Sequence, residues 1–135
     1  MIEIININTV DRQKVKKSLY DGLKSYHDQS SYNLWEVTDK LIRNELAWIS
    51  NAKINVIGRV FERNQKRYFF VFYLWGFDLK NNSKEFVDFL INSLGCTNIE
   101  FVSNTAAHTR LYNILSKKYK STKSLTYDMD LGYNQ

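Results

Sequence analysis

An unbroken run of eight apolar residues, Tyr68–Trp75, constrains the fold of this chain more than any other feature. The run is rich in aromatic residues and has the length of a strand, so we expect a strand rather than a helix. Both of its faces are apolar, which is typical of a central strand covered on each side. The preceding segment, 53–62, alternates in polarity, and Asn64-Gln65 indicates a short turn between the two segments. Together they predict a β-hairpin.

The rest of the chain switches between strand and helix periodicity. Gly76, at the end of the apolar run, indicates a bulge or a close backbone approach. The expected order is β-α-α-β-β-α-β-α-β, with two crossovers that place neighbouring strands parallel. We therefore expect a single α/β domain over 1–135, with a mixed sheet. Outside the hairpin we expect strands at 1–8, 98–102 and 124–131. We expect four helices: one that begins after Thr9, one over about 34–49, one that follows the turn at 78–83 and ends at Gly95, and one that begins at 103–105.

Composition excludes several classes of protein. At 44% hydrophobic residues the chain is too apolar to be disordered. Its longest apolar run is far shorter than a membrane span, and the N-terminus lacks the pattern of a signal peptide. Cys96 is the single cysteine, so an intrachain disulfide is impossible, and no spacing indicates a metal site. Because nothing indicates export, we expect synthesis in the cytoplasm. The absence of proline and the abundance of Asn, Lys, Ile and Tyr are common in AT-rich genomes, including those of bacteriophages, and this indicates a bacterial host.

The net charge of +5 raises the question of nucleic acid. Dense lysines occur at Lys14, Lys16 and Lys17 and within 117–123. Nucleic-acid-binding proteins usually gather such charge on one face, and no recognised binding motif accompanies it here. We interpret the lysines as solvated helix faces, with non-specific contact to nucleic acid through Lys14, Lys16 and Lys17 as an alternative.

The order of elements resembles that of the GNAT N-acetyltransferases. In that family a central strand leads into a glycine-rich turn, Q/R-x-x-G-x-G/A, whose backbone amides hold the pyrophosphate of acetyl-CoA. The segment that matches by position, 75–84, has Gly76 but lacks the glycines of the phosphate turn. If acetyl-CoA binds, the resemblance implies contacts from this turn; the alternative is a polar turn that caps the third helix. The implied cofactor-binding residues here are Phe77, Leu79, Asn81, Asn82, Ser83 and Lys84, with added charge from Lys80.

A second segment, 104–112, resembles the family's N-x-x-A-x-x-L-Y pattern with one extra residue. The resemblance implies a cofactor contact from Asn104 and a general acid in Tyr112, which would protonate the departing CoA thiolate. The family's Gly-Phe is replaced by residues 116–119. From periodicity alone the segment is an amphipathic helix capped by Asn104 or Thr105, with Tyr112 on its flank and His108 exposed.

Three functions therefore remain open. The first is a GNAT-fold protein without catalysis or cofactor, acting by protein binding. Short-tailed bacteriophages carry small internal virion proteins that look like degenerate GNAT domains with an Asn-Thr-x-His-like segment, which 104–110 resembles; partners would then be virion, capsid or tail components. The second is an active N-acetyltransferase that uses acetyl-CoA and an amine. The third and weaker alternative is a basic nucleic-acid-binding module.

Overall fold

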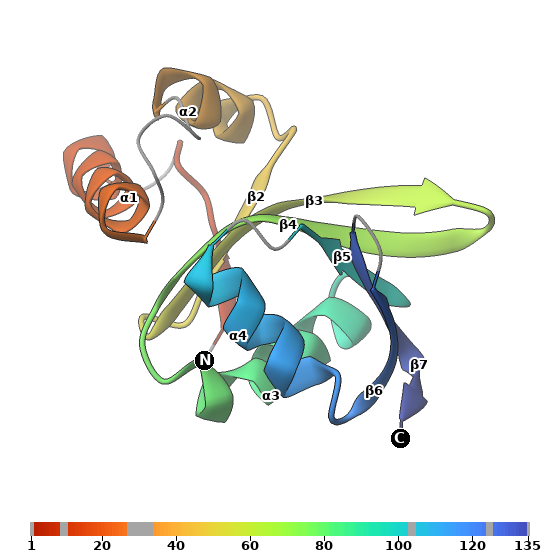
Figure 1. The fold of residues 1–135 in the computed structure, drawn as a ribbon. Coiled ribbons are helices and arrows are strands. Elements are labelled where there is room, and N and C mark those ends of the chain that lie inside the picture. The colour runs from red at the N-terminus through yellow and green to blue at the C-terminus, as the bar shows by residue number, and fades with distance from the viewer. Residues whose placement is uncertain (1, 9–10, 27–33, 103–104, 124–125, 135) are drawn as a thin grey trace.

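The computed structural model describes residues 2–8, 11–26, 34–102, 105–123 and 126–134. Within them the chain forms four helices and one seven-stranded mixed sheet (Figure 1), so the expected α/β fold is confirmed. The elements are β1 (Glu3–Ile5), α1 (Arg12–Tyr26), α2 (Leu34–Ile42), β2 (Ala47–Ser50), β3 (Ile54–Arg63), β4 (Lys66–Gly76), α3 (Leu79–Asn92), β5 (Asn98–Phe101), α4 (Ala106–Leu115), β6 (Tyr119–Lys123) and β7 (Tyr127–Asn134).

The apolar run lies in β4, the fourth strand of the sheet order β1-β2-β3-β4-β5-β7-β6. β4 pairs antiparallel with β3 and parallel with β5, so the first expected crossover is confirmed, and the remaining neighbours pair antiparallel. The second expected crossover was wrong: β6 lies between α4 and β7, and β7 pairs antiparallel with β5. The predicted hairpin is confirmed. At its turn Asn64 and Gln65 have φ of 53° and 65°, as a tight two-residue hairpin turn requires.

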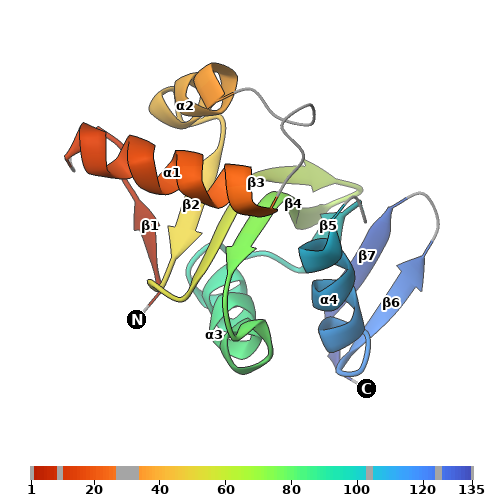
Figure 2. The ribbon, with the colours of Figure 1, turned by 60° about the vertical axis from the view of Figure 1, so that its left-hand side comes forward.

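Helices cover both faces of the sheet, as the two apolar faces of β4 predicted. Figures 1 and 2 show α1 and α2 on one face and α3 and α4 on the other. Along β4, Phe69 and Leu74 belong to the core beneath α3 and α4, while Trp75 belongs to the core beneath α1 and α2. Trp75 packs against Trp48 of β2, with ring centroids 5.8 Å apart.

The second helix is shorter than its periodicity predicted. The helix expected over about 34–49 ends at Ile42, and β2 follows. Asn44 takes a left-handed φ of 59°. Its N–H donates to the Leu41 carbonyl and that of Glu45 donates to the Lys40 carbonyl, which is the Schellman pattern that ends helices. The apolar residues of β2 happen to continue the helical spacing, and this misled the prediction.

The strand β6 was also missed. The sequence of Tyr119–Lys123 contains two lysines and no aliphatic residue, so it gave no strand pattern. β6 pairs with β7 alone and forms one edge of the sheet. Lysines are common on edge strands because they discourage pairing with another chain.

A β-bulge in β4 shapes the site described below. Adjacent residues Ile57 and Gly58 of β3 oppose Tyr73 and Val71 of β4, so Phe72 is the extra residue. Gly58 fits here because a Cβ would lie 2.2 Å from the Phe70 carbonyl oxygen. The bulge thus lies four residues before Gly76. At Gly76 the alternative expectation, a close approach, is confirmed: φ is +128° and a Cβ would lie 2.2 Å from the carbonyl oxygen of Lys53.

Candidate functional site

The two parallel strands at the centre of the sheet pair over only part of β4. β5 pairs with Tyr68–Val71, and its register ends where the bulge begins. In the described part of the chain, the remainder of β4, from Phe72 to Gly76, has no strand beside it on this edge. The start of α3 and one face of α4 flank this part of β4 (Figure 1). The bulge and the incomplete pairing therefore form a cleft at the carboxyl end of the central strand.

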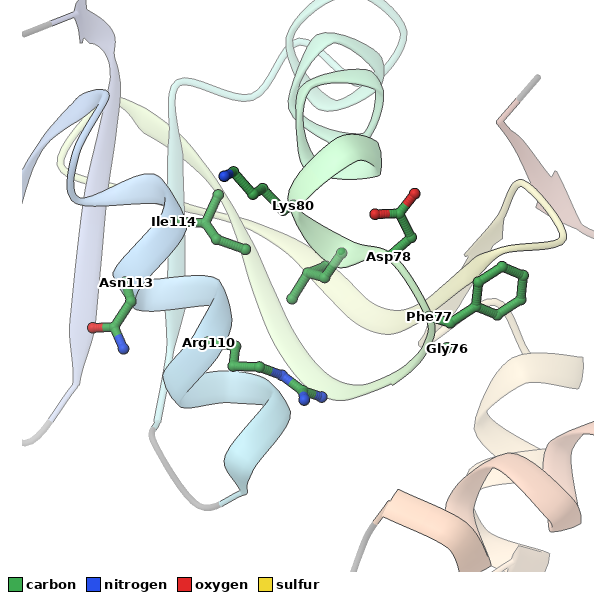
Figure 3. Close-up of a pocket in the computed structure, with 8 residues that line it drawn as sticks. Gly76, Phe77, Asp78, Lys80, Arg110, Asn113 and Ile114 are labelled. Carbon is green, nitrogen blue, oxygen red and sulfur yellow. The ribbon is translucent and has the colours of Figure 1, made fainter.

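The outer part of this cleft is a pocket of about 510 Å³ between the β4–α3 turn and α4 (Figure 3). From the turn it is lined by Gly76, Phe77 and Asp78 and by the first residues of α3, and the other wall is α4. Figure 3 shows the Arg110 side chain extending from α4 toward Gly76, whereas the Phe77 ring is directed away from α4. The remaining lining residues are Leu79, Lys80, Asn113 and Ile114.

The pocket has two basic side chains and one acidic one. Lys80 and Arg110 form no ion pair within the described residues, while Asp78 lines the same pocket. The backbone N–H groups of the first turn of α3 point toward the N-terminus of that helix, where anions are favoured. The outer pocket could therefore hold an anionic group. Sequence reasoning missed Arg110; its position three residues after Ala107, on the same helix face, was the available signal.

The polar side chains of the β4–α3 turn are used to hold the turn itself. Asp78 is left-handed, with φ of 58°. Its side chain accepts from Asn81 Nδ2 at 2.8 Å, and its carbonyl accepts from Asn82 Nδ2 at 2.7 Å. The Asn82 oxygen accepts in turn from Asn51 Nδ2 at 2.9 Å. These hydrogen bonds join Asp78 to the first turn of α3, although Asp78, the N-cap residue, makes no side-chain capping hydrogen bond. The turn expected over 78–83 was too long, because the helix already begins at Leu79.

Two of the other predicted cofactor residues are engaged away from the pocket. Ser83 is buried and donates to the Lys80 carbonyl at 3.2 Å. Lys84 donates to Asp88 Oδ2 at 2.7 Å, a hydrogen bond that raises the pKa of its ammonium. Leu79 does line the pocket, and it also packs against the core. Asn104 lies outside the described residues. A cofactor role for Phe77, Leu79, Asn81, Asn82, Ser83, Lys84 and Asn104 stays a prediction.

The inner part of the cleft is closed. It shares Gly76, Leu79 and Arg110 with the outer pocket, and its other walls are core residues. Only about 10 Å³ is open there, which is the space of one water at most. Those remaining walls are Ile54, Leu74, Trp75 and Ala107.

Tyr112 lies on the opposite flank of α4 from the pocket. At about 100° per residue, it is roughly 200° around the helix from Arg110. Its ring packs on Tyr127 of β7, with centroids 4.3 Å apart, and it is not among the residues that line the pocket. The predicted role of Tyr112 as a general acid stays a prediction.

Thr105 caps α4, as the amphipathic interpretation of this segment predicted. Its Oγ1 accepts from the backbone N–H of His108 at 3.1 Å. The same oxygen lies 2.7 Å from His108 Nδ1. The expectation that His108 is exposed was wrong: its ring is buried, near Phe101, because His108 shares a helix face with the buried Leu111 and Leu115.

The other reactive groups do not gather at the cleft. Cys96 is buried at the end of the α3–β5 connection, and burial raises the pKa of its thiol. Within the described residues no three His, Cys, Asp or Glu side chains come together as metal ligands, and no helix there is long and apolar enough to span a membrane.

Together the strand order, the bulge in β4 and the cleft beside it define an α/β fold of the acetyltransferase type. The chain is similar, over 100% of its length and 93% of the other chain, to the crystal structure of a GNAT-family acetyltransferase from Listeria monocytogenes, with a TM-score of 0.52 and 12% sequence identity. No protein-family model and no curated protein matches the sequence. The chain therefore has the GNAT fold, as its order of elements predicted.

Proposed function

We propose that this chain is a GNAT-fold protein that does not transfer acyl groups and acts by binding another protein. The observation that carries the proposal is the closed inner cleft, with about 10 Å³ of space. A pantetheine arm is an extended chain of many atoms, and it would need the room that Leu74, Leu79 and Ala107 fill. The core would have to open before a thioester could lie along β4.

The remaining chemistry supports the same proposal. General-acid catalysis requires a proton donor within hydrogen-bonding reach of the leaving group. Tyr112 is packed against Tyr127 on the far flank of α4, and Cys96 is buried, with the pKa of its thiol raised. Neither lines the pocket.

The outer pocket is suited to a protein partner. Phe77, at its rim, is 63% exposed, and Arg110 reaches across it (Figure 3). Exposed aromatic side chains beside arginine are typical of the centre of protein interfaces. A carboxylate or backbone carbonyl of the partner would meet Arg110 and Lys80, while an apolar side chain would contact Phe77.

A phage or virion partner is part of this proposal, and it rests on the size of the chain and on the segment around Thr105 and His108, which resembles that of the internal virion proteins. Virions purified from a producing host should contain the protein. The variant with Phe77→Ala and Arg110→Ala should be lost from the particles, whereas Lys117→Gln with Lys118→Gln, at exposed positions beyond α4, should be retained. Absence of the wild-type chain from particles would contradict the virion partner.

An active N-acetyltransferase is the alternative, and one observation favours it. Lys80 of α3 and Arg110 of α4 line the pocket beside the N-terminus of α3, where the GNAT family binds pyrophosphate. Release of free CoA thiol from acetyl-CoA in the presence of amines, at a rate well above that of the protein-free solution, would establish this alternative and refute the first proposal.

A further inference from the structure

A surface formed by α1 and the start of α2, away from the cleft, combines basic and exposed aromatic side chains. The sequence of α1 has five basic residues and one acidic, Asp21, a net charge of +4. The whole chain has +5, so +1 is left for everything else (+5 less +4). Most of the net positive charge of the chain is therefore carried by α1.

Two exposed aromatic rings lie among these lysines. Tyr20 of α1 is 42% exposed, and Trp35 of α2 is 78% exposed. Lys24 Nζ lies 5.5 Å from the centroid of the Tyr20 ring, and Lys16 Nζ lies 5.6 Å from that of Trp35. The second contact joins α1 to α2, which lie on the same face of the sheet (Figure 2). We call Lys16, Lys17, Tyr20, Lys24 and Trp35 the lysine–aromatic face.

Helical geometry places these α1 residues on one side. Lys16, Lys17, Tyr20 and Lys24 fall within about 100° around the helix axis. This arc lies beside Leu19 and Leu23, which are buried in the core and whose mean direction is roughly 90° away. Lys16, Lys17 and Lys24 form no ion pair with any described carboxylate.

We propose that the lysine–aromatic face binds single-stranded nucleic acid, with lysines on the phosphates and bases stacked on Trp35 and Tyr20. Aromatic rings in a basic setting are the usual platform for unpaired bases, because every base has a face that can stack. Lysine supplies the charge that phosphates require, without reading sequence. The proposal does not depend on the cleft or on the protein partner proposed above.

Two other anionic partners fit this face less well. An anionic membrane would need a broad aliphatic face to insert, whereas Ile42, at 38%, is the one exposed aliphatic residue among the described side chains of α1 and α2. An acidic protein would more often meet arginine, since lysine is depleted at the centre of protein interfaces. The combination of lysine and exposed rings favours unpaired bases.

The chain carries its own reporter for this contact. Of its three tryptophans, Trp48 and Trp75 are buried and Trp35 is exposed. Titration with an oligothymidylate of about 15 nucleotides should therefore quench the fluorescence of Trp35 saturably. Trp35→Ala should weaken binding roughly 5- to 150-fold, the range expected for loss of one stacked base, with the melting temperature little changed because the side chain is exposed.

Salt and charge variants complete the test. Replacing Lys16, Lys17 and Lys24 by Gln should reduce the slope of log K against log salt by about 2, at roughly 0.7 for each lost phosphate contact. The control, Lys117→Gln with Lys118→Gln, should leave the slope unchanged. Three results would overturn the proposal. The first is no binding at about 50 mM salt. The second is binding that neither quenches tryptophan fluorescence nor weakens in Trp35→Ala, and the third is equally tight binding of polyglutamate or anionic vesicles at matched charge.

Discussion

Substitution of Gly58 by alanine tests whether the bulge in β4 depends on a close backbone approach. The added Cβ would lie 2.2 Å from the Phe70 carbonyl oxygen and 2.4 Å from Phe69 Cε1. Real Cβ contacts are essentially never shorter than 3.0 Å, so the Phe70 carbonyl would have to retreat by about 0.8 Å. It is part of the backbone beside the bulge and cannot rotate away as a side chain would.

The expected loss follows from two opposing effects. Alanine in place of glycine stabilises a strand by about 0.5–1 kcal/mol, because the unfolded chain has less freedom to lose. Overpacking a core usually destabilises by about 1–3 kcal/mol and sometimes more, and contact with backbone places this case at the upper end. We predict that Gly58→Ala lowers the free energy of unfolding by about 2 kcal/mol, which corresponds to roughly 5–10 °C in melting temperature.

Urea unfolding followed by circular dichroism measures this difference. Gly132→Ala is the matched control, since Gly132 also lies in a strand and the nearest atom to its added Cβ is Asp130 Oδ1 at 3.4 Å. That variant should stay within about 0.5 kcal/mol of the wild type. If Gly58→Ala is as stable as Gly132→Ala, the bulge does not constrain this position and the account of the cleft is wrong.

Two further predictions concern the cap of α4 and the buried thiol. Thr105→Ala should lower the free energy of unfolding by about 1 kcal/mol, because the His108 N–H loses its acceptor, while Thr105→Ser should restore it; equal losses for both would argue against the cap. Burial raises the pKa of Cys96 above its ordinary value of 9.0, although Arg67 opposes the shift. The unfolded chain therefore releases the thiol proton first as the pH rises, so the free energy of unfolding should fall above pH 9.0. In Cys96→Ala this fall should be smaller. If the urea midpoints of the two proteins, each divided by its own value at about pH 8, change equally with pH, the assignment is refuted.

The fold could be predicted where periodicity and burial agree. The run in β4 is apolar on both faces and the hairpin turn has residues that tolerate positive φ, so the centre of the sheet followed from local pattern. The end of α2 did not, because it depends on the left-handed Asn44 and on backbone hydrogen bonds to Leu41 and Lys40. The alternation of β2 is too short to compete with the helical spacing before it.

The candidate site was predictable only in outline. Its position after β4 followed from the resemblance to the GNAT fold. Which side chains face the pocket depends on the bulge at Phe72 and on the angular position of residues around α4, and one extra residue in 104–112 leaves the family's pattern ambiguous there. Arg110 rather than Tyr112 lines the pocket. Sequence spacing does not reveal that the inner cleft is filled, since this is a property of packing.

The central claim is that the cleft does not admit the acyl-pantetheine arm. Calorimetric titration with acetyl-CoA, compared with 3′-phospho-ADP under the same conditions, tests it most directly, because the two ligands share the phosphorylated nucleotide and differ in the acyl-pantetheine arm. We predict that acetyl-CoA binds no more tightly than 3′-phospho-ADP, any affinity coming from Lys80 and Arg110 at the outer pocket. Saturable binding of acetyl-CoA at least about tenfold tighter than that of 3′-phospho-ADP, a difference of about 1.4 kcal/mol, would contradict the claim.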